Sequence, residues 1–195
     1  MTEYIEDATE TEPPMFPKGI HQLLGWSYAM QGIDPHEPSV HAKMILMADD
    51  GIIKPVIIGG INIKGLRQEH VFGTAAQIRK RVEESVTDEQ RATIWARYGD
   101  SKSIKSKKYD GMELLATGHR LQLRRSDEML QDCIWHIVCT DIEREACPMY
   151  LIAKKHGLSA GTVHSTIVNL RKILRRYQDG ADSTLRQVFK KDNVL

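Results

Sequence analysis

Apolar positions in the C-terminal half of the chain follow the 3.6-residue period of amphipathic helices. One run follows Ser126 and comprises Met129, Leu130, Cys133, Ile134, Ile137 and Val138. A second run comprises Val163, Ile167, Leu170 and Leu174. Ser126 and the two acidic residues after it predict the start of a long helix, and Pro148 suits the first turn of a later one. This half of the chain is therefore expected to be helical.

The N-terminal half predicts short helices and one β-hairpin. Asp50 and Gly51 supply turn chemistry between two apolar runs, which favours a hairpin. Thr87 and Gln90 have the spacing of a capping box, in which each side chain bonds a free backbone N–H of the other residue. The predicted elements are helices over 21–31, 73–84 and 87–98 and a hairpin that pairs 40–47 with 52–58.

The stretch from Tyr150 to Arg176 predicts two helices joined by a tight turn. Gly157 stands where the first helix must stop and the chain reverse, a place that favours positive φ. Ser159 can accept a hydrogen bond from a free N–H of the second helix, as an N-cap residue does. Small Ala153 before the turn and β-branched Val163 after it suit two helices that cross at about 90 to 120°. The pattern is that of a helix-turn-helix.

Charge separates this motif from a plain helical hairpin, which has the same apolar pattern. No acidic residue occurs from Cys147 to Gln178. The basic residues of the stretch are Lys154, Lys155, Arg171, Lys172, Arg175 and Arg176. Because segments of one positive sign bind phosphate well, the charge favours the helix-turn-helix over the hairpin and indicates DNA as a ligand.

Residues 152–175, IAKKHGLSAGTVHSTIVNLRKILR, resemble the last two helices of region four of bacterial sigma factors. In that family an alanine, a Gly-Leu/Ile-Ser turn and a Thr-Val pair open the recognition helix, and basic residues close it. Residues 87–98, TDEQRATIWARY, are similar to the helix that precedes the motif there, and a long insertion separates the two segments here. The resemblance implies a DNA-reading helix that begins after the turn.

The overall layout resembles the late-gene antitermination proteins of temperate phages, the Q-type regulators. Those proteins are of about this size and carry a tryptophan-bearing helix near the N-terminus and a sigma-like helix-turn-helix near the C-terminus. Residues 21–32, HQLLGWSYAMQG, are similar to the first of these helices. Some members have a four-cysteine zinc module without a counterpart here, so the resemblance is to the zinc-free groups. It implies a transcription regulator that acts on RNA polymerase.

The formal net charge of +1 conceals a difference between the two halves of the chain. Residues 1–100 hold 10 basic and 15 acidic side chains, whereas residues 101–195 hold 17 and 11. Three cysteines without paired spacing fit a reducing cytoplasm. The most apolar run, 52–61, is short and interrupted, so no membrane span is expected. The acidic N-terminus lacks the positive region of a signal peptide, and we expect a cytoplasmic protein.

These features predict a mainly α fold with a C-terminal helix-turn-helix of the sigma region 4 type and a small β-hairpin in the N-terminal half. The expected linker contains four lysines, Lys102, Lys105, Lys107 and Lys108. They either contact DNA or belong to a solvated connector, and the connector is the favoured alternative. The expected divisions are a disordered acidic tail over 1–17, an N-terminal domain over 18–98, a basic linker loop over 99–111, a helical DNA-binding domain over 112–177 with the motif at 148–176, and a C-terminal tail with a short helix over 178–195.

Cys133, His136 and Cys139 carry the side chains that zinc prefers. A residue six positions along a helix is rotated by about 240°, so Cys139 is expected to point away from Cys133. Buried apolar cysteines are the favoured alternative, and we expect no metal and no cofactor. Gly59-Gly60 lacks the spacing and the lysine of a phosphate loop, and no positioned acid accompanies His164 and its neighbouring serines. We therefore expect no enzyme activity.

The sequence thus predicts a sequence-specific DNA-binding transcription regulator of phage or prophage type. Double-stranded DNA is its expected partner, and the resemblance adds RNA polymerase and a role in antitermination. The alternative is an interaction protein that binds the polymerase through its sigma-like helices and reads no DNA. Base edges are assigned to the exposed start of the second helix and phosphates to the residues around it. The candidate DNA-binding residues are Lys154, Lys155, Ser159, Ala160, Gly161, Thr162, His164, Ser165, Asn169, Arg171 and Arg175.

Overall fold

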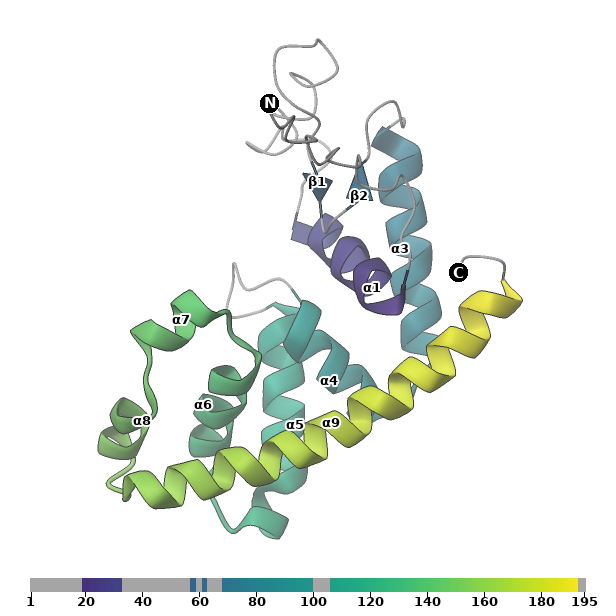
Figure 1. Ribbon diagram of the computed structural model, residues 1–195. Coiled ribbons are helices and arrows are strands. Elements are labelled where there is room, and N and C mark those ends of the chain that lie inside the picture. The colour runs from purple at the N-terminus through teal and green to yellow at the C-terminus, as the bar shows by residue number, and fades with distance from the viewer. Residues whose placement is uncertain (1–18, 33–56, 59–60, 63–67, 100–105, 193–195) are drawn as a thin grey trace, which may run out of the picture.

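The computed structural model describes residues 19–32, 57–58, 61–62, 68–99 and 106–192, which are almost entirely helical (Figure 1). The predicted mainly α character agrees with this. The predicted acidic tail, 1–17, lies outside these residues. The helical elements are α1 (Ile20–Ala29), the 3-10 helix η1 (Met30–Gly32), α3 (Gln68–Ser85), α4 (Asp88–Tyr98), α5 (Lys107–Leu123), α6 (Asp127–Val138), α7 (Asp141–Ala146), α8 (Met149–Lys155) and α9 (Ala160–Lys191).

The β-hairpin predicted in the N-terminal half is wrong. Strand β1 (Ile57–Ile58) pairs antiparallel with β2 (Ile61–Asn62), downstream of it, rather than forming the second arm of the predicted hairpin. Only two glycines separate the paired strands in the sequence, and Gly-Gly is a better two-residue hairpin connection than the longer Ala-Asp-Asp-Gly stretch. Each strand is two residues long, so the described residues contain no β layer. The predicted first arm, 40–47, falls outside them.

Polar side chains at the N-termini of the helices set several of the helix boundaries. Thr87 and Gln90 form the predicted capping box of α4, with N···O distances of 3.2 and 3.4 Å between each backbone N–H and the other side chain. Ser126 caps α6 as predicted. Thr140 and Glu143 form a second capping box, at the start of α7, which the sequence analysis missed. These bonds satisfy N–H groups that a helix leaves without a partner.

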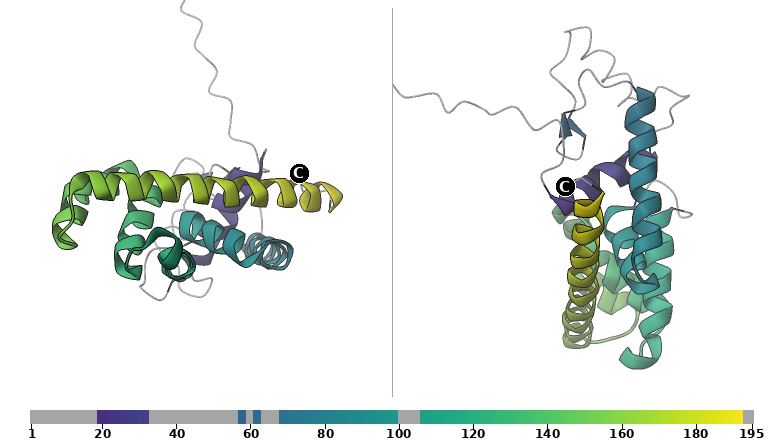
Figure 2. Two further views of the ribbon diagram at one scale, coloured as in Figure 1. Left: turned by 90° about the horizontal axis from the view of Figure 1, so that it is seen from below. Right: turned by 90° about the vertical axis from the view of Figure 1, so that its right-hand side faces the viewer.

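Helix α9 is the common wall of two apolar clusters (Figures 1 and 2). Its C-terminal half packs against α1, α3 and α4 through residues such as Leu185 and Phe189. Its N-terminal half packs against α6 and α8 through residues such as Val163 and Leu170. Helix α4 joins the clusters, since Ile94 belongs to the first and its alanines to the second. The packing therefore crosses the domain boundary expected after Tyr98.

The C-terminal tail expected over 178–195 is instead part of α9, which continues without a break to Lys191. At 1.5 Å per residue, its 32 residues span roughly 48 Å. Ala181, Leu185 and Phe189 continue the apolar face of the first half at spacings of four. Gly180 interrupts this face without ending the helix, and the only described atoms near a Cβ there would be those of the flexible Gln90 side chain. No helix in the described part of the chain, α9 included, is long and apolar enough to cross a membrane.

Helix α5 begins inside the segment predicted as a basic linker loop over 99–111. Nζ of Lys107 lies 3.7 Å from Oε1 of Glu83 and 3.8 Å from the centre of the Trp95 ring. Lys108 is buried, with its Nζ 4.7 Å from the ring centre of Trp135. Cation–π contacts of this kind hold both amines against protein. Lys107 and Lys108 therefore belong to the fold, while Lys102 and Lys105 lie outside the described residues.

Candidate nucleic-acid interface

A left-handed glycine makes the turn between α8 and α9. Gly157 has a φ of 63°, and the backbone N–H of Leu158 donates to the carbonyl of Ala153 at 2.9 Å, which closes the end of α8. A Cβ on Gly157 would meet nothing within 4 Å, so the position requires glycine for its backbone conformation and not for space. The predicted positive φ at this turn is confirmed.

The first turn of α9 is held by three hydroxyl side chains. Oγ of Ser159 accepts the backbone N–H of Thr162 at 3.1 Å, which confirms the predicted N-cap. The hydroxyls of Ser159 and Thr162 are 2.9 Å apart, and Ser165 donates to the carbonyl of Thr162 at 2.9 Å. These bonds stiffen the beginning of the helix, and both serines bond Thr162 rather than His164.

The apolar contact predicted between the two helices is present. Ala153 of α8 and Val163 and Ile167 of α9 are buried in the same cluster. Small Ala153 lets α8 approach α9 closely, as the crossing of two helices in this motif requires. Cys133 and Ile134 of α6 belong to the same cluster, so α6 supports the pair from the interior.

The opposite face of the first turns of α9 is open. Ala160, Gly161, His164, Ser165 and Asn169 are exposed, and Thr162 is half-buried. Neither His164 nor Asn169 makes a hydrogen bond or ion pair with any residue that the structure describes. Five residues apart, these two side chains are rotated by about 140° from each other, so they occupy opposite flanks of the open face. Ala160 and Gly161 allow another molecule to approach closely.

The two lysines at the end of α8 are not equivalent. Nζ of Lys155 lies 2.8 Å from Oδ2 of Asp132 and 3.2 Å from Oε1 of Glu128. The hydrogen bond to Asp132 raises the pKa of Lys155. His156 contacts the same Asp132 oxygen at 2.7 Å through Nε2. Because two carboxylates already hold Lys155, exposed Lys154 is the better candidate for a phosphate contact.

This acidic contact could not be read from the charge of the motif alone. Asp132 precedes Lys155 by 23 residues in the sequence and reaches it only because α6 packs beside α8. The helical register of α6 is the sequence feature that indicates an acidic face, since Glu128 and Asp132 are four residues apart and share one face.

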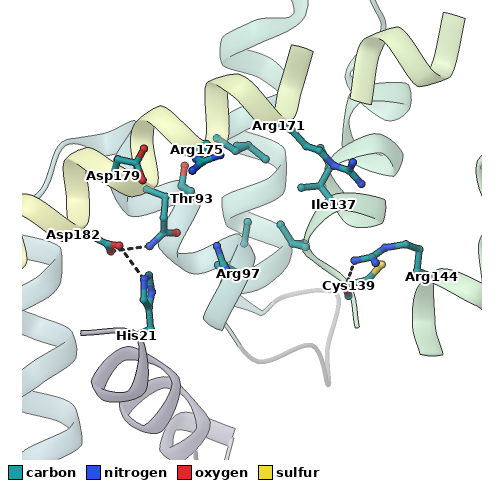
Figure 3. Close-up of a pocket in the computed structure, with 14 residues that line it drawn as sticks. His21, Thr93, Arg97, Ile137, Cys139, Arg144, Arg171, Arg175, Asp179 and Asp182 are labelled. Atoms are coloured by element: carbon teal, nitrogen blue, oxygen red, sulfur yellow. Dashed lines mark hydrogen bonds and ion pairs between the residues drawn. The ribbon is translucent and has the colours of Figure 1, made fainter. Parts of the chain in front are cut away.

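Arg171 and Arg175 face a pocket of about 600 Å³ beneath α9, which Arg97 of α4 and Arg144 of α7 also line (Figure 3). Both residues are exposed, and no carboxylate oxygen of the described residues lies within 4.0 Å of either guanidinium. The pocket lining does not include their basic neighbours on the same helix, Lys172 and Arg176. The basic middle of α9 thus divides into a pocket-facing pair and an outer pair.

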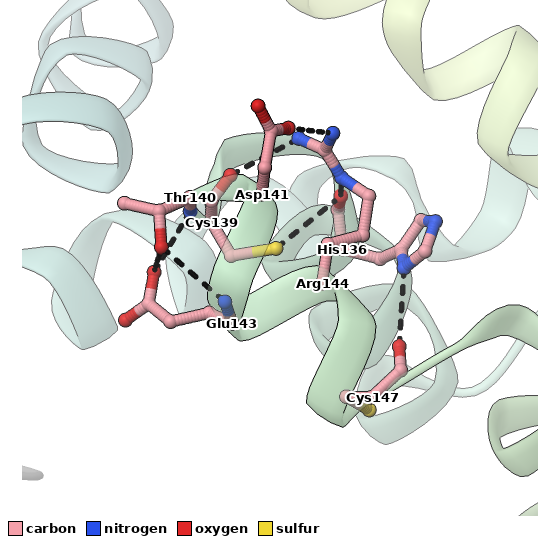
Figure 4. A network of polar contacts seen from close by, with 7 residues as sticks. All are labelled: His136, Cys139, Thr140, Asp141, Glu143, Arg144 and Cys147. Carbon is pink, nitrogen blue, oxygen red and sulfur yellow. Dashed lines mark hydrogen bonds and ion pairs between the residues drawn. The ribbon is translucent and has the colours of Figure 1, made fainter.

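Arg144 joins the end of α6 to α7 (Figure 4). Its Nε donates to the carbonyl of His136 at 3.1 Å and its Nη2 to the carbonyl of Cys139 at 3.0 Å. Its Nη1 pairs with Oδ1 of Asp141 at 2.7 Å. The carbonyls at the end of a helix have no partner within the helix, so Arg144 stabilises the C-terminus of α6 and fixes one wall of the pocket.

His136 connects α6 to the segment that precedes α8 (Figure 4). Its Nδ1 lies 3.2 Å from the carbonyl oxygen of Cys147. Burial lowers the pKa of His136, and the positive charges of Arg144 and Arg171 lower it further, against the opposing effect of this hydrogen bond. The neutral imidazole therefore donates its Nδ1–H to the carbonyl.

The two cysteines of α6 and its C-cap are packed as apolar residues. Cys133 is fully buried, and burial raises the pKa of its thiol to about 12. Cys139 is also buried, and its Sγ lies 3.5 Å from the carbonyl oxygen of His136. Within the described ranges, no three or more His, Cys, Asp or Glu side chains are arranged to hold a metal ion.

No protein-family profile, no curated protein and no solved structure matches the chain. A functional assignment therefore depends on the geometry of α8 and α9, on their charges and on the sigma-like pattern of residues 152–175.

Proposed function

We propose that the chain is a sequence-specific, double-stranded DNA-binding transcription regulator of phage or prophage type. The observation that carries the proposal is the open N-terminal face of α9, which α8 supports across the left-handed turn at Gly157. A helix presented in this way can enter the major groove with its first turns against the bases. The excess of basic residues in 101–195 supplies the attraction to phosphate.

Several exposed residues of the motif have specific roles in this proposal. Ala160 and Gly161 let α9 approach the base pairs, and His164 is the longest side chain that reaches a base edge. The imidazole of His164 can donate to or accept from the groups that bases present in the major groove. Lys154 and Asn169 contact phosphates on the two sides of the groove, which fixes the register of the helix.

Action on RNA polymerase as an antiterminator is the second part of the proposal. Its support is the similarity of the layout to the Q-type regulators. Arg171 and Arg175 lie beyond the part of α9 that enters the groove and point away from the outer basic pair, so they can meet an acidic protein surface beside the DNA.

Exposed apolar side chains favour a second candidate, an interaction protein that binds the polymerase without reading DNA. Ile142 of α7 is 82% exposed, and Tyr150 and Leu151 of α8 are 64% and 39% exposed. In a helix-turn-helix the first helix crosses the DNA backbone, for which apolar side chains are poorly suited. Such side chains are typical of a protein contact.

Footprinting on fragments of the source genome, with and without RNA polymerase, separates the two functions. A DNA-reading regulator protects a defined sequence on its own, whereas the interaction protein protects DNA only when polymerase is present. A fragment with the same composition in shuffled order is the control for attraction to phosphate alone. Protection spread evenly over both fragments would contradict the proposed reading of sequence.

Replacing the pocket-facing pair, Arg171→Ala with Arg175→Ala, tests the contact with polymerase. We expect transcriptional activity to fall by a larger factor than DNA affinity, because these residues lie beside the groove-reading turns. The matched control is Lys172→Ala with Arg176→Ala, which removes the same charge from the outer side of the same helix. Proportional losses of activity and affinity in the first variant would assign the two arginines to DNA alone.

A further inference from the structure

The pocket beneath α9 is lined by more positive than negative side chains. Arg97, Arg171 and Arg175 all line it, and none has a carboxylate oxygen within 4.0 Å among the described residues. Two aspartates also line it. Asp182 is engaged by His21 at 3.1 Å and Gln178 at 2.9 Å (Figure 3). Asp179 has no cationic partner within 4.0 Å among the described residues, so three arginines stand against one free carboxylate. Like charges around one cavity repel one another, so an anion there would stabilise the fold.

Hydrogen bonds within the protein hold one wall of the pocket in place without a ligand. The bonds from Arg144 to the carbonyls of His136 and Cys139 hold that guanidinium in place. Burial lowers the pKa of His136, and the positive charges of Arg144 and Arg171, which both line the pocket, lower this pKa further. The positive field therefore extends through this side of the cavity.

The rest of the lining suits an organic group. Ile137, Val138 and Leu174 supply apolar surface, and Thr93 supplies a hydroxyl. The volume of about 600 Å³ falls within the range of roughly 300 to 1,000 Å³ that is typical of small-molecule sites. A bare inorganic anion would fill only a small part of it.

We propose that this pocket binds a small organic phosphate, with the phosphate oxygens among Arg97, Arg171 and Arg175 and the organic part against Ile137 and Leu174. Guanidinium groups offer paired N–H donors that match phosphate oxygens. A phosphate monoester carries about −1.5 to −2 charges at pH 7 and three acceptor oxygens, so it offsets the charge of several arginines better than a carboxylate of charge −1 does. Arg97 belongs to α4, and Arg171 and Arg175 lie beyond the first turns of α9, so the site is separate from the open face proposed to read DNA. It uses the same two arginines that are proposed above to meet polymerase.

Calorimetry on the full chain without DNA tests the proposal, with phenyl phosphate and inorganic phosphate as probes. We expect saturable binding of phenyl phosphate that is tighter than that of inorganic phosphate. Arg97→Gln and Arg171→Gln should each weaken it by about tenfold, since each loses a charge-assisted contact. Arg97→Lys should weaken it less, because the charge remains. The matched control is Arg176→Gln, an exposed arginine of α9 outside the pocket, which should bind phenyl phosphate as the parent chain does.

Two results would overturn the proposal. One is an equal loss in Arg176→Gln, or an effect no greater than that of sodium chloride at the same ionic strength, because either means that the anion only screens surface charge. The other is binding of benzoate as tight as that of phenyl phosphate, which would exclude selectivity for phosphate. Circular dichroism of each variant verifies that it folds. Since no DNA is present, failure here is distinguishable from failure of the proposed DNA reading.

Discussion

His164 is the side chain on which the proposed reading of DNA depends most. It is exposed at the open start of α9 and makes no hydrogen bond or ion pair with any residue that the structure describes. The serines near it are less available, because the hydroxyls of Ser159 and Ser165 already bond Thr162. A side chain without an internal role costs the fold little when it is replaced, so a change in DNA recognition can be measured cleanly.

Replacing His164 by alanine should relax specificity at one or two base pairs, at a cost of about 1 to 3 kcal/mol in binding to the preferred sequence. Affinity for random duplex should stay nearly unchanged, since no phosphate contact is lost. The measurement is a comparison of binding to single-base variants of the preferred site. Ser183→Ala, on the exposed face near the other end of α9, is the control. An unchanged profile for His164→Ala would remove this residue from the reading set.

Lys154 and Lys155 should differ in their contribution to phosphate binding, although they are neighbours of the same charge. Lys154→Ala should reduce the slope of log affinity against log salt by about 0.9, the value for one lost phosphate contact. Lys155→Ala should leave the slope almost unchanged, because Asp132 and Glu128 already hold that amine. Equal reductions in both variants, measured on one duplex over a range of salt, would show that DNA displaces the carboxylates.

At the scale of helices, close approach of backbones decides which positions tolerate change. Gly111 of α5 lies where that helix crosses α4, and a Cβ there would be 2.5 Å from the carbonyl oxygen of Ala92 and 2.7 Å from the backbone nitrogen of Ala96. Gly118 is on the same helix, exposed, and a Cβ there would meet nothing within 4 Å. Gly111 therefore leaves no space for a larger side chain, whereas the position of Gly118 has space for one.

Gly111→Ala should destabilise the fold by about 1 to 3 kcal/mol, because the obstacle is backbone that cannot move aside. Gly118→Ala should instead stabilise it by about 0.5 to 1 kcal/mol, since alanine is the better helix former in open space. Urea unfolding of the two variants beside the parent chain measures both. A loss of stability in Gly118→Ala as large as that in Gly111→Ala would contradict the close crossing of α4 and α5.

The sequence predicts helices well where the signal is local. The capping box at Thr87, the N-cap at Ser159 and the positive φ at Gly157 depend on residues within a few positions, and all three are present. The hairpin turn was misplaced because an Asp-Gly pair and a Gly-Gly pair both supply turn chemistry. Helix α9 is longer than expected because its packing on the first apolar cluster outweighs the helix-breaking tendency of Gly180.

At the scale of the whole molecule, α9 connects the motif proposed to read DNA to the rest of the described chain. Its first half carries the open face and its second half lies in the cluster formed with α1 and α3 (Figure 1). The candidate site could be predicted only in part, because the contact of Lys155 with Asp132 joins residues 23 apart in the sequence, which only the packing of α6 beside α8 brings together. The pocket beneath α9 likewise draws on α1, α4, α6, α7 and α9.

The most direct test of the account is a map of backbone amide chemical shifts as a duplex that carries the footprinted sequence is added to the full chain. We expect the largest changes at residues 157–165 and at Lys154, with little change at 181–189 near the other end of α9. A shuffled duplex should give weaker changes, concentrated at the basic residues. Tight binding of the footprinted duplex with amides 159–165 unmoved would contradict the claim that the start of α9 reads DNA.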